Sequence, residues 1–179
     1  MKQWKKEYHP RNAIGRFTRN GRVSSIVPGM GEPININSEE CDIDSITAEI
    51  ESDPKNASRI LRQAIADGRL STRVHRGNQD KHIPGTQNYK QEIANGREPS
   101  ILTADVEYLI KKHAGRGIPQ FTRKGKWTQK EMFCDDDYIG VYKNKRYSSS
   151  HKTHRGQIHY SNKGVHIVPE QDQKHDKKK

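Results

Sequence analysis

The stretch GQIHYSNKGVHIVP, residues 156–169, carries two histidines seven positions apart on either side of a turn. A turn over Ser161–Gly164 sets His159 opposite His166 in an antiparallel hairpin. In this register four apolar side chains share the other face, namely Ile158, Tyr160, Val165 and Ile167. A slip of one residue would mix polar and apolar side chains on both faces, so burial selects this register. We therefore predict two neighbouring imidazoles, with Cβ atoms about 4.5–5.5 Å apart, on the polar face of a sheet.

Helices precede strands in the predicted order of elements. Amphipathic helices are expected over residues 53–68 with Asp53 as N-cap, residues 86–96, and residues 103–115 with Thr103 as cap. After Gly117 the apolar spacing changes to a period of about two residues. Strands are expected in a hairpin over residues 119–133, at residues 137–142 and in the closing hairpin, with a polar connection over residues 143–156. This order predicts an α+β fold in which N-terminal helices pack on a C-terminal antiparallel sheet.

The composition limits the size of the core. Only 30% of the 179 residues are hydrophobic, 31% are charged, and the formal net charge is +11. Such a chain has room for one modest core with polar extensions. Its positive charge favours an acidic partner, most often nucleic acid; the alternative is that the charge only keeps the protein in solution. The cysteines, Cys41 and Cys134, form no metal-binding or disulfide motif.

Charge divides the chain into segments. Residues 1–22 carry seven Lys and Arg against one Glu, whereas residues 23–54 carry eight acids and no Lys or Arg. We interpret residues 1–52 as a basic and then acidic extension, partly disordered, residues 53–169 as the α+β domain, and residues 170–179 as a disordered tail. In one interpretation the acidic stretch folds over a basic surface until substrate displaces it, and in the other both segments are solvated.

No apolar stretch is long enough for a transmembrane helix, and the start MKQWKKEYHP lacks the apolar region of a signal peptide. We therefore expect a soluble protein that is made in the cytoplasm and has no membrane partner. Delivery into a target cell or association with a virion would then need a signal other than this N-terminus.

Two adjacent imidazoles among basic residues suit RNA cleavage without a metal. One group takes the proton from a ribose 2′-hydroxyl, a second protonates the leaving 5′-oxygen, and a cation stabilises the charge on the phosphate. Histidine, whose unperturbed pKa is about 6.5, performs either proton transfer near neutral pH. The alternative is that the paired histidines have no function.

We expect no cofactor and no metal. The segment HKTH, His151–His154, has ligand-like spacing but no nearby Cys or acid that would complete a tetrahedral site. The segment DDD, Asp135–Asp137, is interpreted as a solvated turn at the start of a strand.

Five segments between residues 81 and 169 follow one another in a characteristic order. They are KHIPGTQNY (Lys81–Tyr89), GREPSIL (Gly96–Leu102), GKWTQKE (Gly125–Glu131), IGVY (Ile139–Tyr142) and IHYSNKGVHIVP (Ile158–Pro169). Together they resemble the bacterial polymorphic toxin type 50 domain over about residues 79–169. The resemblance implies a ribonuclease toxin with a fold like those of barnase, EndoU, colicin and RelE, helices followed by an antiparallel sheet. Such domains also occur in phage minor head proteins.

The resemblance also indicates the site. The residues that match the family's motif are His82, Ser100, Lys130, Glu131, His159, Ser161 and His166. Arg116 stands where many relatives have a small or polar residue, which affects surface charge more than mechanism. Our hypothesis makes His159 and His166 the acid–base pair, with His82 as the alternative partner. In the competing interpretation His82 only caps the helix that starts near Thr86.

The other candidates supply charge and orientation. In the same hypothesis Lys130 or Arg97 faces the scissile phosphate, and Glu131 orients a histidine or serves as base. Ser161 is expected to hydrogen-bond the phosphate. In the alternative, Lys130 and Glu131 are a solvated pair on a strand. The RNA-binding candidates are Arg97, Ser100, Lys126, Lys163 and Arg155.

The predicted function is a metal-independent endoribonuclease, either a toxin or a phage-delivered effector. Its partners would be RNA and an immunity protein or a phage capsid protein. The main alternative is a non-catalytic nucleic-acid-binding or phage head-associated protein that uses the same basic face. A third interpretation is an interaction protein whose acidic region binds a partner.

Overall fold

The part of the chain that the computed structural model describes, residues 42–144 and 149–172, begins with helices and ends with strands. The helices are α1 (Ile43–Ser52), α2 (Ala57–Ala66), α3 (Arg76–Gln79), α4 (Gln87–Ala94) and α5 (Val106–His113), with 3₁₀ turns η1 (Pro54–Asn56) and η2 (Asp80–His82). The strands are β1 (Ile101–Leu102), β2 (Ile118–Phe121), β3 (Trp127–Cys134), β4 (Gly140–Asn144), β5 (Ser149–Thr153), β6 (Arg155–Ser161) and β7 (Gly164–Pro169). The predicted α+β fold class is confirmed. The expectations for residues 1–41 and 173–179 lie outside the described residues.

The strands form two antiparallel sheets rather than one. One sheet has the order β2-β3-β6-β7 and the other has the order β1-β4-β5. Strand β5 corrects the prediction that residues 143–156 form a polar connection, because β5 pairs with β4 from Gly140↔Thr153 to Asn144↔Ser149. Most side chains of β5 are exposed or half-buried, so its sequence SSHKT has no apolar alternation by which the strand could be recognised.

The predicted register of the closing hairpin is confirmed. His159 pairs with His166, and Tyr160 pairs with Val165. The four apolar side chains of the hairpin are at most 3% exposed, namely Ile158, Tyr160, Val165 and Ile167. Gly164 in the turn has a φ of +112°, and a Cβ atom there would meet the carbonyl oxygen of Arg73. This position therefore requires glycine.

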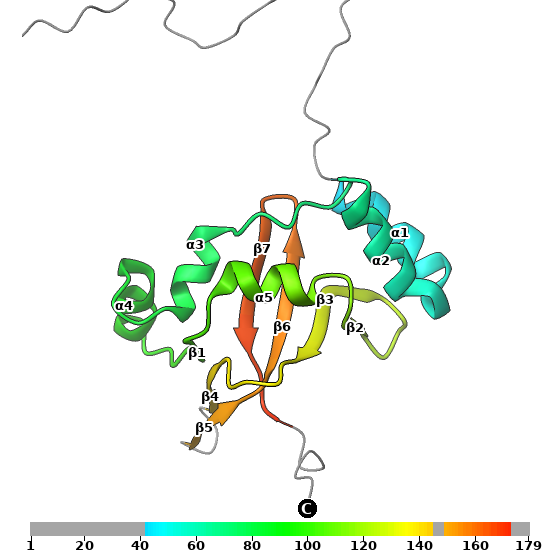
Figure 1. Ribbon diagram of the computed structural model, residues 1–179. Coiled ribbons are helices and arrows are strands. Elements are labelled where there is room, and N and C mark those ends of the chain that lie inside the picture. The colour runs from blue at the N-terminus through cyan, green and yellow to red at the C-terminus, as the bar shows by residue number, and fades with distance from the viewer. Residues whose placement is uncertain (1–41, 145–148, 173–179) are drawn as a thin grey trace, which may run out of the picture. The chain divides into compact units, whose positions relative to one another are not determined.

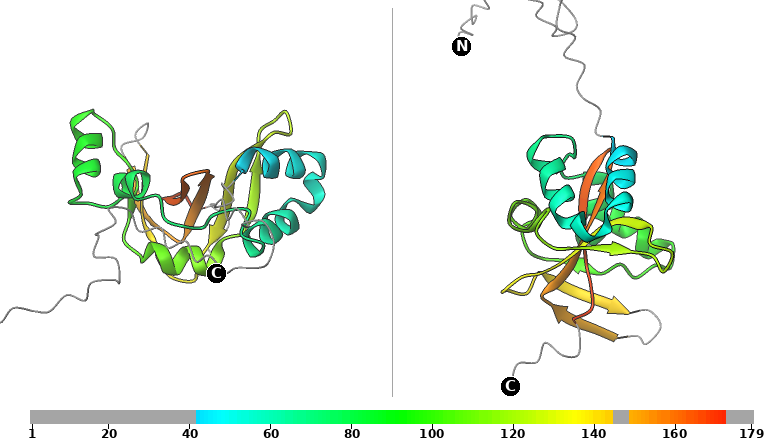
Figure 2. Two further views of the ribbon diagram at one scale, coloured as in Figure 1. Left: turned by 90° about the horizontal axis from the view of Figure 1, so that it is seen from above. Right: turned by 90° about the vertical axis from the view of Figure 1, so that its right-hand side faces the viewer.

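Helix α5 covers the apolar face of the four-stranded sheet. Figure 1 shows α5 crossing in front of β6 and β7, and Figure 2 shows no helix of the described residues across the middle of the opposite face. Leu109 and Ile110 of α5 are buried in the same core as Ile158 and Ile167. One face of the sheet is thus committed to the core, and the other carries the polar side chains.

The ordered unit extends beyond the expected bounds at both ends. Helix α1 lies in the stretch assigned to the extension, yet its isoleucines Ile43, Ile46 and Ile50 are at most 4% exposed. Their spacing of three and four residues is that of one buried helix face, although the stretch around them is acidic. Residues 170–172, assigned to the tail, are also ordered, and Asp172 accepts hydrogen bonds from the hydroxyl of Thr153 (2.8 Å) and the amide of His154 (3.1 Å).

The helices are short, and their caps differ in part from those predicted. Asp53 makes no capping hydrogen bond, because the 3₁₀ turn η1 follows it and α2 begins only at Ala57. Thr86 caps α4 by accepting a hydrogen bond from the amide of Tyr89. Asp105, not Thr103, caps α5, because the hydroxyl of Thr103 donates to the carbonyl of Ile139 instead. No helix within residues 42–144 and 149–172 combines the length and the apolar character needed to span a bilayer.

A segment of irregular chain closes the free edge of β7. Val74 forms a parallel bridge with Val165, made by hydrogen bonds of 2.8 Å from Val165 to Arg73 and from His75 to Val165. Five residues on, the side-chain amide of Gln79 takes the place of a strand, because it donates to the carbonyl of Ile167 (3.2 Å) and accepts from its amide (2.8 Å). Gln79 is 0% exposed, so these outward-facing groups of β7 are satisfied without water.

We expect Gln79→Ala to lower the free energy of unfolding by about 2–3 kcal/mol, because it leaves a buried amide and a buried carbonyl unpaired. Gln63→Ala is the matched control, since Gln63 makes an exposed hydrogen bond to Asp67, and we expect it to change stability by about 0.5 kcal/mol or less. Urea denaturation measures both. Equal effects of the two substitutions would show that the Gln79 amide does not hold the edge.

Candidate active site

A row of polar residues crosses the uncovered face of the four-stranded sheet. Lys130 of β3 pairs with His159 of β6, and His159 pairs with His166 of β7. Residues directly opposite one another in a sheet share a face. The parallel bridge of Val74 with Val165 places the next residue, His75, beside His166 on that same face. The row therefore continues from Lys130 through two paired histidines to a third at the sheet edge.

His82 joins this row from outside the sheet. It is the last residue of η2, which follows directly after Gln79, so the bond of Gln79 to β7 brings the imidazole to the strand. The ring of His82 lies 6.3 Å from that of His166, centroid to centroid, with 16° between the ring planes. Its Nδ1 lies 2.8 Å from the carbonyl oxygen of Ser100. Because a carbonyl only accepts, Nδ1 carries the proton and Nε2 presents a lone pair in the neutral ring.

His159 and His166 are in contact. Their ring centroids lie 4.7 Å apart with the planes at 67°, an edge-to-face arrangement. The Nε2 of His159 lies 3.1 Å from the side-chain oxygen of Gln157, two residues along the same face. The cluster of His82, His159 and His166 thus places three half-buried imidazoles side by side, with Lys130 next to His159.

Burial keeps these imidazoles neutral at neutral pH. The pKa of His159 is lowered to about 3, chiefly by burial and also by the positive charges of His166 and Lys130. The pKa of His166 is lowered to about 4, again chiefly by burial, with His82 and His75 adding to the effect. Burial also lowers the pKa of His82, against the opposing hydrogen bond to Ser100. A negatively charged ligand would reverse part of these shifts, because it favours the protonated rings.

The structure places Glu131 on the other side of the sheet. Its carboxylate is 0% exposed and accepts hydrogen bonds from the amides of Gly115 and Gly117 and from the hydroxyl of Tyr160. Burial raises the pKa of Glu131, and these three donors oppose that rise. Such a carboxylate fastens the α5–β2 connection to β3. The Glu131 carboxylate therefore lies on the core face of the sheet, opposite to the row of polar residues.

The two predicted serines are engaged within the protein. Ser100 is 7% exposed, its carbonyl orients His82, and its hydroxyl accepts from the amide of Lys143 (3.2 Å). Ser100 is therefore engaged within the protein through both its carbonyl and its hydroxyl, and it orients the ring of His82. The hydroxyl of Ser161 donates to the carbonyl of Gly164 (2.8 Å) and so closes the hairpin turn.

The predicted RNA-binding cations do not gather at one place. Arg97, after α4, forms an ion pair with Glu92 (2.9 Å), and Lys126, in the β2–β3 turn, forms one with Glu51 (2.6 Å). Lys163 is exposed in the β6–β7 turn. Arg155 is half-buried on the polar face, paired with Cys134 four residues along β6 from His159.

Sequence reasoning did not single out His75 or Gln157. No pattern in the sequence signals that His75 lies at the site, because its place depends on a parallel bridge between segments some ninety residues apart. The place of Gln157 could have been predicted from the register, because Gln157 lies two residues before His159 in β6 and therefore on the same face.

The acidic segment Asp135–Asp137 is not simply a solvated turn. Asp135 is 8% exposed and accepts from Nε2 of His113 (2.6 Å) and Nζ of Lys112 (3.0 Å). Against the opposing effect of burial, these donors hold the pKa of its carboxyl well below the usual range. This ion-pair group ties α5 to the end of β3. Among the described residues, no three His, Cys, Asp or Glu side chains are arranged to hold a metal ion.

Comparison with known proteins adds a family to this geometry. The family model of bacterial toxin 50 matches residues 74–169, which is more than half of the chain. The chain belongs to the bacterial toxin 50 family. The match includes the row of Lys130, His159 and His166 together with His75 and His82. No curated protein matches the chain. The matched range begins at Val74, which lies in the segment that closes the edge of β7.

The lowered pKa values of the buried histidines predict how stability depends on pH. An unfolded histidine binds its proton near pH 6.5, whereas His159 and His166 in the folded state do so near pH 3 and pH 4. The unfolded state therefore binds more protons between these values, and stability falls as the pH falls below about 6.5. We expect a loss of about 2 kcal/mol between pH 7.5 and pH 5, allowing for partial exposure and coupling of the rings.

The double variant His159→Gln, His166→Gln should lose clearly less stability over this range, and His151→Gln, at an exposed position of β5, should behave as the parent. Urea denaturation at each pH measures the difference. If the double variant loses as much stability as the parent, the two rings are not protonated on unfolding in the way described here.

Proposed function

We propose that this toxin domain is an endoribonuclease that cleaves RNA by attack of a ribose 2′-hydroxyl. The observation that carries the proposal is the cluster of three imidazoles beside Lys130 on the uncovered face of the sheet. The cluster brings together two groups for proton transfer and one fixed positive charge, which are the groups that this reaction needs. Membership of a toxin family adds support, because damage to RNA is a direct way to stop a cell.

The tautomer of His82 suits it to act as the base. Its Nε2 presents a lone pair, because Nδ1 donates to Ser100. In the proposed step Nε2 takes the proton of the 2′-hydroxyl while the 2′-oxygen bonds to phosphorus. The bond from phosphorus to the 5′-oxygen breaks, and an imidazolium gives its proton to that oxygen. The products are a 2′,3′-cyclic phosphate and a free 5′-hydroxyl.

His166 is the better partner for His82 as the acid. The rings of His82 and His166 are nearly parallel and 6.3 Å apart, so their edges can face one phosphodiester together, whereas the edge of one ring meets the face of the other where His159 contacts His166 at 4.7 Å. We therefore propose His82 and His166 as the acid–base pair. His159 then contacts the phosphate together with Lys130, its neighbour across the strands. Lys130 stabilises the negative charge that grows on the phosphate.

The substrate itself supplies what the free site lacks. With pKa values of about 3 and about 4, His159 and His166 are unprotonated at neutral pH before RNA binds. A bound phosphodiester brings a negative charge to the rings and raises their pKa values. The imidazole that serves as the acid is thus protonated when substrate is bound. We further propose that the domain acts inside a target cell and that the producing cell holds an immunity protein against it.

Incubation of the purified full chain with RNA in excess EDTA tests the proposal. We expect fragments that end in 2′,3′-cyclic phosphate. His82→Ala and His166→Ala should each slow cleavage by about 100-fold or more, and Lys130→Ala should slow it strongly with partial rescue by Lys130→Arg. His151→Ala is the matched control and should cleave near the parent rate. Intact RNA that is bound in a salt-sensitive manner would instead identify a non-catalytic RNA-binding protein.

The pH dependence of cleavage should differ between kcat/KM and kcat. The profile of kcat/KM reports the pKa values of the free enzyme. Because the acid, His166, has a pKa of about 4 there, its protonated fraction falls as the pH rises. We expect kcat/KM to be higher at pH 5 than at pH 7.5, and the profile of kcat to lie at higher pH because bound phosphate favours the imidazolium. If the two profiles coincide, bound substrate does not raise the pKa of the acid.

A further inference from the structure

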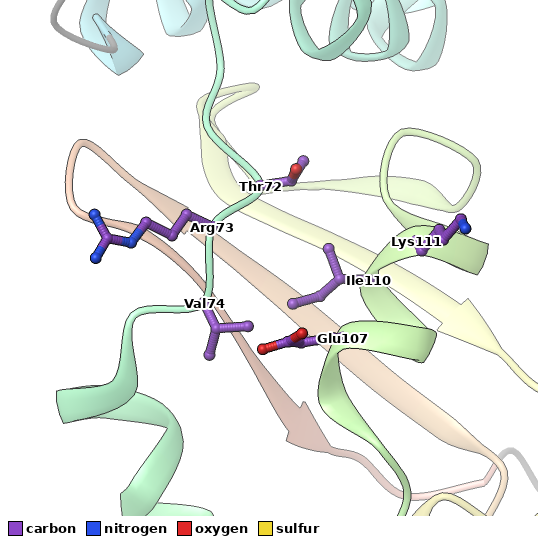
Figure 3. A pocket seen from close by; sticks show the side chains of 6 residues that line it. All are labelled: Thr72, Arg73, Val74, Glu107, Ile110 and Lys111. Atoms are coloured by element: carbon purple, nitrogen blue, oxygen red, sulfur yellow. The ribbon is translucent and has the colours of Figure 1, made fainter.

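The edge segment Arg73–His75 carries two side chains that the proposed reaction does not use. Val74, between them, pairs with Val165 and packs against the core. Successive side chains of an extended segment point to opposite faces, so Arg73 and His75 lie on the side away from the core. Figure 3 shows this alternation: Val74 points toward Ile110 of α5, whereas the guanidinium of Arg73 points away from the helix.

His75 is the neighbour of His166 across the sheet edge. The parallel bridge sets the two residues side by side, and neighbouring strands lie about 4.8 Å apart. The Nδ1 of His75 is buried and has no hydrogen-bond partner among the described residues. A buried N–H without an acceptor is rarer in proteins than an unused acceptor. In the neutral ring this favours the tautomer with the proton on Nε2, which can donate a hydrogen bond to a ligand at the end of the row.

Arg73 is an exposed cation two residues before His75. No ion pair that the described residues form involves Arg73, whereas the nearby Arg69 and Arg76 pair with Glu49 (3.0 Å) and Glu107 (2.7 Å). A guanidinium without a carboxylate partner is well suited to a phosphate, which it can contact with two parallel hydrogen bonds.

We infer that Arg73 and His75 form a second phosphate-binding subsite, which holds the RNA phosphate next to the scissile one. This inference rests on the proposed function for the identity of the scissile site. The RNA strand then runs across the strands of the sheet along the row of polar residues, from Lys130 past the histidine cluster to the edge segment. The preferred substrate class is an RNA chain of three or more nucleotides, because a dinucleoside monophosphate has no second phosphate to place there.

Two measurements on the full chain test the subsite. The first is the ratio of kcat/KM for a trinucleotide to that for a dinucleoside monophosphate. We expect Arg73→Ala and His75→Ala each to lower this ratio about tenfold, the effect of one charged hydrogen bond. The second is binding of a 2′-deoxy oligonucleotide, which cannot be cleaved, at several salt concentrations. Arg73→Ala should reduce the slope of log affinity against log salt by about 0.7, the value for one phosphate contact on a single strand.

Arg76→Ala is the matched control. It removes the same charge three residues after Arg73, from a side chain that already forms an ion pair with Glu107. It should leave both measurements close to those of the parent. An unchanged ratio and slope in Arg73→Ala and His75→Ala would overturn the subsite, as would equal losses on both substrates. If the parent cleaves no RNA, the proposed reaction fails, but the deoxyoligonucleotide measurement still decides whether these residues bind phosphate.

Discussion

The pairing of β6 with β7 is the constraint on which the site depends. Four apolar residues of this hairpin must face α5, and a hairpin has only two faces. Once their burial is satisfied, His159 and His166 have to be opposite each other on the polar face. The chemistry of the site is therefore not arranged separately from the fold. The same pairing energy that builds the core also sets the distance between the two imidazoles.

A second constraint brings in residues that are distant in sequence. The bonds of Gln79 and of the Arg73–His75 segment to β7 align η2 with the strand, and η2 ends in His82. Ser100 then fixes the orientation of the His82 ring from a different part of the chain. The cluster thus combines a local hairpin with a non-local edge. Its burial disfavours charge on all three rings, and an anionic ligand would relieve this.

The parts that sequence reasoning predicted are those set by local pattern. Alternation of apolar residues was enough for the hairpin register, and apolar spacing between turn residues was enough for α2, α4 and the β2–β3 hairpin, although Asp53 does not cap α2. Strand β5 was missed because its side chains are all polar and mostly exposed or half-buried, so the strand has no apolar period. His75 was missed because a parallel bridge to a remote strand leaves no trace in the sequence around it. Glu131 is among the residues that match the family's motif. Its position in β3, opposite Ile158, nevertheless places its side chain in the core.

The use of a side chain to close the edge of β7 has a consequence for association between molecules. An open strand edge offers a row of unpaired amides and carbonyls, on which the strand of another chain can add. Gln79 occupies this position at Ile167 without presenting a free edge of its own, since a side-chain amide has no continuing backbone. The toxin domain can therefore expose the polar face of its sheet to a large ligand while this border gives no template for aggregation.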